Sequence, residues 1–147
     1  MKKLILSLLV AAFVGGNTLS AQTITKNEDG KYSLSVGHVT LTVDAQKGGK
    51  IVSYRYDDKE ILSQTKIPNS FGSTFWTSPQ SEWNWPPVPE YDTKPFNAEV
   101  AGDKLILTGE KSKRFGYRVR KELTTDKKDN AIVITYTIIN ESGETRK

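Results

Sequence analysis

All three tryptophans and all six prolines of the chain fall in one window, between Pro68 and Pro95. The flat faces of indole rings pack against the C–H faces of a pyranose ring, and the sugar hydroxyls bind amide and carboxylate groups. Polar side chains alternate with the indoles in this window, as a small-molecule site requires. The sequence therefore predicts a carbohydrate-binding site formed by Asn69, Trp76, Gln80, Glu82, Trp83 and Trp85.

The prolines predict that the window is an ordered loop. Proline lacks a backbone donor and fixes φ, so the run from Trp85 to Pro89 can form neither a helix nor a central strand. In an extended chain, Trp83 and Trp85 would share one face, with Asn84 on the opposite face. The alternative is that the rings only cover the protein's own core, which we expect of Phe71 and Phe75.

Other residues of the chain have side chains that could take part in catalysis, but they do not make up a recognisable catalytic or metal site. Glu82, Glu90 and Asp92 lie in the same loop, and paired acids among aromatic rings could serve glycoside chemistry, although acids in exposed loops are usually solvated. His38 is the only histidine and there is no cysteine, so the chain lacks the usual ligands of a zinc site. A Ser–His nucleophile pair would have to use His38. No phosphate-loop or dinucleotide motif occurs. We therefore predict no catalytic residue, no metal and no cofactor.

The first residues have the pattern of a secretory signal peptide. Lys2 and Lys3 precede an apolar run over residues 4–14, and a small residue, Ala21, is the predicted last residue removed. The run is shorter than the ~20 residues of a membrane-spanning helix. Residues 1–21 thus predict an exported protein, periplasmic or secreted, with no membrane span after the signal is removed.

The remaining residues, 22–147, have the size of one domain. Two of the 21 Lys and Arg residues lie in the signal, which leaves 19 against 17 Asp and Glu. Charges of both signs are interspersed and form no basic face, so nucleic acid is not a predicted partner.

Alternation of apolar and polar residues predicts an all-β fold, an antiparallel β-sandwich. In the segment 115–123, alternation places Phe115, Tyr117, Val119 and Lys121 on one face. We find no convincing helix. The expected strands are 32–36, 38–43, 51–56, 60–62, 98–100, 105–108, 115–123 and 131–139.

The last of these strands, 131–139, is apolar on both faces. That pattern is typical of a central strand covered on two sides. Because the sequence stops at Lys147, we expect the natural protein to continue and the domain 22–147 to be incomplete at its C-terminus.

Three segments resemble a family of uncharacterised exported bacterial proteins related to galactose mutarotase (aldose 1-epimerase). They are GGKIVSYRYDDKEIL at 48–62, NSFGSTFWTSPQSEWNWPP at 69–87 and FGYRVRKELTTDKKDNAIVITYTIINES at 115–142. The middle segment is the most specific, and the resemblance covers nearly all of residues 31–142.

The resemblance implies a galactose-mutarotase-like super-sandwich with a sugar-binding concave face, of which this chain is the N-terminal half. It implies binding-face roles for Trp76, Gln80, Trp83 and Trp85. In the mutarotases a histidine is the general acid and a late glutamate is the general base. No residue of this chain matches either position, so the resemblance supports carbohydrate binding, and sugar processing stays undecided.

A rival hypothesis is a cell-envelope interaction module without catalytic activity. In that case Pro86-Pro87-Val88-Pro89 would form a stiff, polyproline-like ridge recognised by a protein partner.

Overall fold

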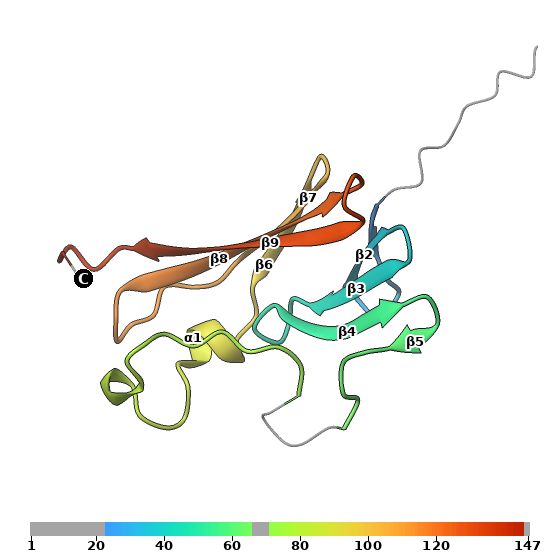
Figure 1. Cartoon of the computed structure of the whole chain (residues 1–147). Helices are drawn as coiled ribbons and strands as arrows, with labels where there is room; N and C mark the ends of the chain where they lie inside the picture. The colour runs from blue at the N-terminus through green and yellow to red at the C-terminus, as the bar shows by residue number, and fades with distance from the viewer. Residues whose placement is uncertain (1–22, 66–70, 146–147) are drawn as a thin grey trace, which may run out of the picture.

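The chain folds almost entirely into two antiparallel sheets (Figure 1). The computed structural model describes residues 23–65 and 71–145. The predicted signal peptide, residues 1–21, lies outside the described residues. Within them, no helix is long and apolar enough to cross a membrane.

The first sheet contains five strands in sequence order, each hydrogen-bonded to the next. They are β1 (Ile24–Lys26), β2 (Tyr32–Val36), β3 (Val39–Asp44), β4 (Lys50–Tyr56) and β5 (Lys59–Glu60). Alternate residues of β2 are buried, namely Tyr32, Leu34 and Val36. The period of two in the sequence therefore corresponds to a sheet with one face on the core.

The second sheet contains four strands in the order β6-β7-β8-β9. They are β6 (Asn97–Ala101), β7 (Lys104–Thr108), β8 (Tyr117–Asp126) and β9 (Ala131–Asn140). On β8 the buried residues are Val119, Lys121 and Leu123, which confirms the face predicted for Val119 and Lys121. All eight predicted strands are present, with ends shifted by up to three residues, whereas the short β1 was not predicted.

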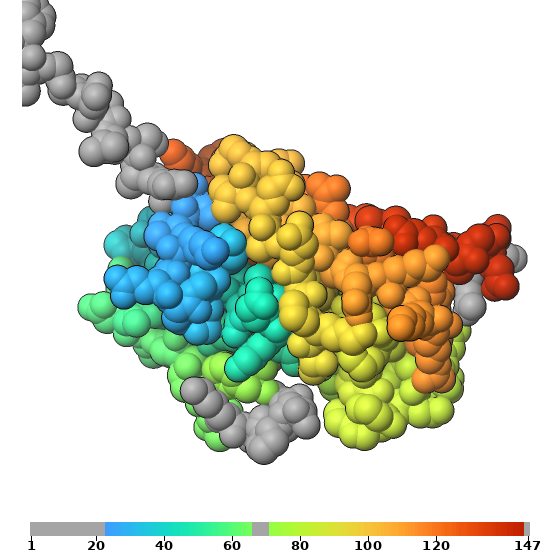
Figure 2. Space-filling view, turned by 180° about the vertical axis from the view of Figure 1, so that it is seen from behind, coloured from blue at the N-terminus to red at the C-terminus, as the bar shows by residue number. Residues whose placement is uncertain are grey.

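The two sheets and the loop between them enclose one apolar core. The first sheet covers one end of the inner face of the second sheet, and the loop 71–96 covers the other end (Figure 1). Seen from behind, this loop lies against the strands of the second sheet (Figure 2). The buried apolar residues come from all three parts, for example Leu34 from β2, Trp83 from the loop and Leu107 from β7. The β-sandwich prediction is therefore confirmed, and the loop is part of the core.

In the described residues the last strand lies at the edge of its sheet, and its expected central position, which depends on a continuation of the chain, stays a prediction. β9 pairs with β8 only, and it is an edge strand of its sheet. Val133, Tyr136 and Ile138 are exposed, so neither face of this strand is fully covered. His38, expected within a strand, lies in the turn before β3, where its Nδ1 is 2.7 Å from Asp57 Oδ1.

Candidate functional site

The aromatic loop contains two short helical turns and is fastened to the second sheet. A 3-10 turn, η1 (Gln80–Glu82), follows Pro79, and the single-turn helix α1 (Pro89–Asp92) begins with a proline at its first position, where no backbone donor is needed. Arg114, ahead of β8, donates from Nη1 to the Trp83 carbonyl at 3.2 Å and from Nη2 to the Glu82 carbonyl. These bonds hold the middle of the loop at one position on the sheet.

Trp83 belongs to the core. Its side chain is 4% exposed, and its Nε1 donates to the Thr77 carbonyl at 2.9 Å. The prediction that Trp83 and Trp85 share an exposed face is wrong because Asn84, between them, has a left-handed backbone with φ of 56°. The three residues are therefore not extended, and successive indoles point to different environments.

Trp76 and Trp85 are the exposed indoles. Trp76 is 45% exposed and Trp85 is 64% exposed, and their ring centroids are 6.0 Å apart at an interplanar angle of 85°. Trp76 also packs edge-on against the buried Trp83, with centroids 5.8 Å apart. Its Nε1 is 3.3 Å from Asp92 Oδ1. The exposed pair thus rests on the buried ring and on a buried carboxylate.

A cleft of about 480 Å³ adjoins Trp76. It lies between the loop and the ends of β8 and β9. The Asn140 side chain is fixed at this cleft, because its Oδ1 accepts from the Ser142 N–H at 3.0 Å and its Nδ2 donates to the Glu144 carbonyl at 2.7 Å. The lining residues are Phe75, Trp76, Thr77, Ser78, Pro79, Glu82, Tyr117, Ile138 and Asn140.

The structure brings together only some of the predicted site residues. Trp76 and Glu82 line the cleft, whereas Gln80 and Trp85 are exposed on the loop and are not part of its lining. Trp83 lies in the core, and Asn69 lies outside the described residues.

The two phenylalanines expected in the core are only half-buried. Phe75 stacks on Tyr136 of β9, with ring centroids 5.1 Å apart and planes 8° apart. Phe71 lines a separate cavity. Phe75 therefore forms a wall between the core and the cleft.

The three acids of the loop do not face a common cleft. Glu82 lines the cleft beside Trp76, whereas Glu90 pairs with Lys94 at 3.0 Å. Asp92 is buried and pairs with Lys50 at 3.1 Å. The arrangement contains no pair of carboxyl groups placed across one ligand site. Across residues 23–65 and 71–145, no three His, Cys, Asp or Glu side chains are grouped so that they could hold a metal ion.

The sequence did not reveal the contribution of the second sheet to the cleft. Tyr117, Ile138 and Asn140 lie at strand ends more than twenty residues from the loop in sequence. Their alternation predicted the strands, but only the pairing of Tyr117 with Asn140 across β8 and β9 places them side by side. No local signal could have identified them.

Comparison of the chain with protein-family models, with curated proteins and with solved structures found no match. The resemblance to the galactose mutarotase relatives therefore stays a prediction from the quoted segments.

Proposed function

We propose that this chain is an exported carbohydrate-binding protein that holds a neutral sugar ring on Trp76 and Trp85, beside the cleft formed with β8 and β9. The observation that carries the proposal is the pair of exposed indoles at right angles on a fastened loop. Such large apolar side chains are normally buried in a protein that binds nothing. The segments shared with galactose mutarotase relatives and the pattern of residues 1–21 support the same proposal.

The cleft supplies groups that suit a sugar. Trp76 gives an apolar ring face, Glu82 accepts hydrogen bonds from hydroxyls, and the Thr77 and Ser78 hydroxyls can donate or accept. A mostly apolar cavity with a few placed polar groups is the usual form of a small-molecule site. The proposal is restricted to binding, because the acids of the loop are separated.

The polyproline ridge of the rival hypothesis is interrupted in the structure. Val88 is buried in the core and Pro89 is the first residue of α1, so the four residues from Pro86 to Pro89 do not form one exposed ridge. We therefore favour a carbohydrate over a protein partner for this loop.

Tryptophan fluorescence titration and a glycan array test the proposal. We expect neutral hexoses, with galactose first, to change the emission of the exposed indoles. Trp85→Ala should weaken binding by about 30-fold, since truncating an aromatic anchor costs about 2 kcal/mol. Trp85→Phe should retain most of the binding affinity.

Tyr56→Ala is the matched control, because Tyr56 is also an exposed aromatic residue but lies on the first sheet. The variant should bind like the unchanged protein. If no neutral glycan binds, or if Trp76→Ala and Trp85→Ala bind as well as the unchanged protein, the loop is not the site.

A further inference from the structure

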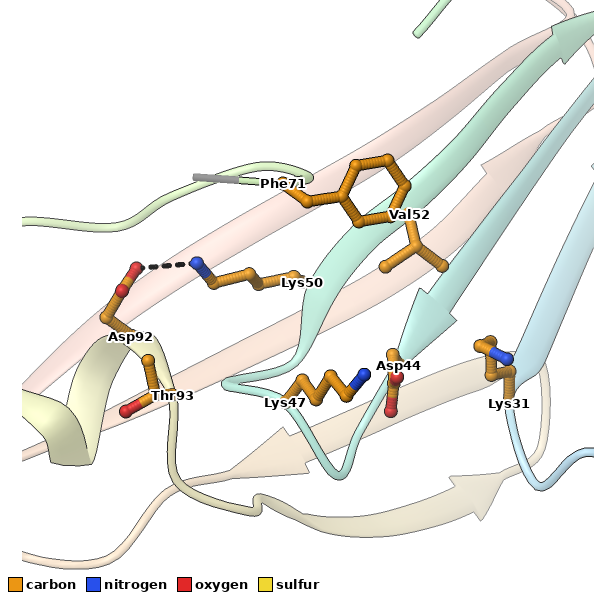
Figure 3. Close-up of a pocket in the computed structure, with 8 residues that line it drawn as sticks. All are labelled: Lys31, Asp44, Lys47, Lys50, Val52, Phe71, Asp92 and Thr93. Carbon is orange, nitrogen blue, oxygen red and sulfur yellow. Dashed lines mark ion pairs between the residues drawn. The ribbon is translucent and has the colours of Figure 1, made fainter. Parts of the chain in front are cut away.

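A second cavity lies on the other side of the Trp76–Asp92 hydrogen bond, between β4 and α1. Its volume is about 480 Å³, and among the described residues it shares no lining residue with the cleft described above. Figure 3 shows Lys50 and Asp92 facing each other at one end, Phe71 and Val52 along one side, and Lys31, Asp44 and Lys47 along the other. Thr93 also lines the cavity.

The ammonium group of Lys50 is the unusual feature of this cavity. The Lys50 side chain is 7% exposed, and its Nζ lies 3.1 Å from Asp92 Oδ1. Among the described residues, Asp92 is the only partner of this ammonium group, which has three donors. The same carboxylate oxygen also accepts from Trp76 Nε1 at 3.3 Å. A buried ammonium with a single, shared partner is costly, and because Lys50 lines the cavity, a ligand there can accept hydrogen bonds from its remaining N–H groups.

The charges around the cavity favour an anion. The described residues of its lining include three lysines and two aspartates, a net charge of one positive. Lys121, which is buried behind Gly48 and Gly49, adds to the positive side. These charges favour an anionic ligand over a neutral one, and one carboxylate group balances the charge of the described lining itself.

The remaining lining groups suit a hydroxylated ring. Phe71 and Val52 form an apolar wall, against which the C–H face of a ring packs. Asp44 and Thr93 can accept hydrogen bonds from hydroxyl groups. Lys47 is exposed at the rim, and none of the described residues pairs with its ammonium group.

We propose that the cavity between β4 and α1 binds a hydroxylated monocarboxylate of the hexuronate class. Lys50 binds the carboxylate group, the positive charge of Lys47 at the rim attracts the anion, and Phe71 packs against the sugar ring. This site is separate from the neutral-sugar site at Trp76 and Trp85 and does not depend on it.

Isothermal titration calorimetry of the purified chain at pH 7 and low ionic strength tests the proposal, with D-glucuronate, D-glucose, acetate and inorganic phosphate as probes. We expect glucuronate to bind more tightly than acetate and phosphate. Lys47→Gln should weaken glucuronate binding by about threefold, because it removes one exposed positive charge at the rim. The exposed Lys59 on β5 is the control, and Lys59→Gln should leave binding unchanged.

Lys50→Met alone leaves Asp92 buried without a cation, so the test uses the double variant Lys50→Met/Asp92→Asn, which removes both charges. We expect this variant to fold and to lose glucuronate binding. Binding of glucuronate that survives both this variant and Lys47→Gln would place the site elsewhere. Phosphate binding as tight as glucuronate binding would overturn the carboxylate assignment, and so would absence of glucuronate binding.

Trp85→Ala separates this proposal from the neutral-sugar proposal. We expect the variant to keep full glucuronate affinity while neutral-sugar binding falls. If Trp85→Ala weakens glucuronate binding to the same degree as Lys47→Gln, the two clefts are not independent and the second site is refuted.

Discussion

Lys121 should make the protein more stable as the pH rises above neutrality. Its side chain points inward from β8 and is 3% exposed, and its Nζ donates to the Gly48 carbonyl at 2.7 Å and to the Gly49 carbonyl at 3.1 Å. Burial lowers the pKa of Lys121 from 10.5 to about 8, with a smaller contribution from Lys50, while the charge of Asp92 opposes the shift. The folded protein therefore releases this proton well before the unfolded chain does.

The sign of the effect follows from proton binding. Between pH 8 and 10.5 the unfolded chain binds more protons than the folded protein, so the free energy of unfolding rises with pH. From pH 7 to pH 10 the two pKa values give a gain of about 2–3 kcal/mol. The two carbonyl groups and the Phe96 ring, 4.9 Å from Nζ, favour the charged form and make this value an upper limit.

Tyr91 sets the upper end of this pH window. Burial raises the pKa of Tyr91 from 10.0 to about 12, and a hydrogen bond with Ser112 opposes the shift. Above pH 10 the unfolded chain loses the tyrosine proton first, so the stability contributed by the neutral phenol decreases from there. The free energy of unfolding should therefore reach its maximum near pH 10.

Urea unfolding, followed by circular dichroism at pH 7, 8, 9 and 10, measures this dependence. The control is Lys121→Met, which keeps the length of the side chain but does not titrate. We expect the variant to be less stable at pH 7, because the Gly48 and Gly49 carbonyls lose a donor, and to show no rise with pH. A stability of the unchanged protein that is flat or falling from pH 7 to 10, or an equal rise in Lys121→Met, would refute the reasoning.

Four further predictions concern two tryptophans of the loop and two glycines, each measured as the free energy of unfolding. Trp83→Ala should cost about 3–5 kcal/mol because a buried indole is lost, whereas Trp85→Ala should change stability by less than about 0.5 kcal/mol because that ring is mostly exposed. Gly48→Ala should cost more than about 3 kcal/mol, since φ is +66° and the added Cβ would lie 2.0 Å from the Asp92 carbonyl oxygen. Gly102→Ala, with a similar φ of +63° but open space around it, should cost only about 1 kcal/mol.

The strands were predictable because their alternation has one cause, burial of one sheet face. Residues 32–36 alternate in sequence and in burial, and the inward position of Lys121 on β8 followed from the same period. Alternation does not reveal how deeply a residue is buried, so neither the burial of Lys121 nor its two carbonyl partners could be predicted. Its depth depends on the Gly48–Gly49 turn of the other sheet.

The loop was harder to predict because one backbone angle decides which indole is exposed. The spacing of Trp83 and Trp85 predicted a shared face, and the left-handed Asn84 separates them. Asparagine adopts this conformation more readily than most residues, but the sequence alone did not select it here. The cleft was equally inaccessible to prediction, because Asn140 reaches it only through the pairing of β8 with β9.

The buried and the exposed indoles of the loop depend on each other. If a loop becomes ordered only when a ligand binds, the entropy cost of ordering it lowers the affinity for the ligand. Large apolar rings on a mobile loop would also pack onto the protein's own surface. Here Trp83 fills the core, and Arg114 binds the carbonyls of Glu82 and Trp83, so the backbone next to Trp85 is fixed before any ligand arrives. Loss of Trp83 should therefore remove the binding geometry together with stability, whereas loss of Trp85 should remove only a ligand contact.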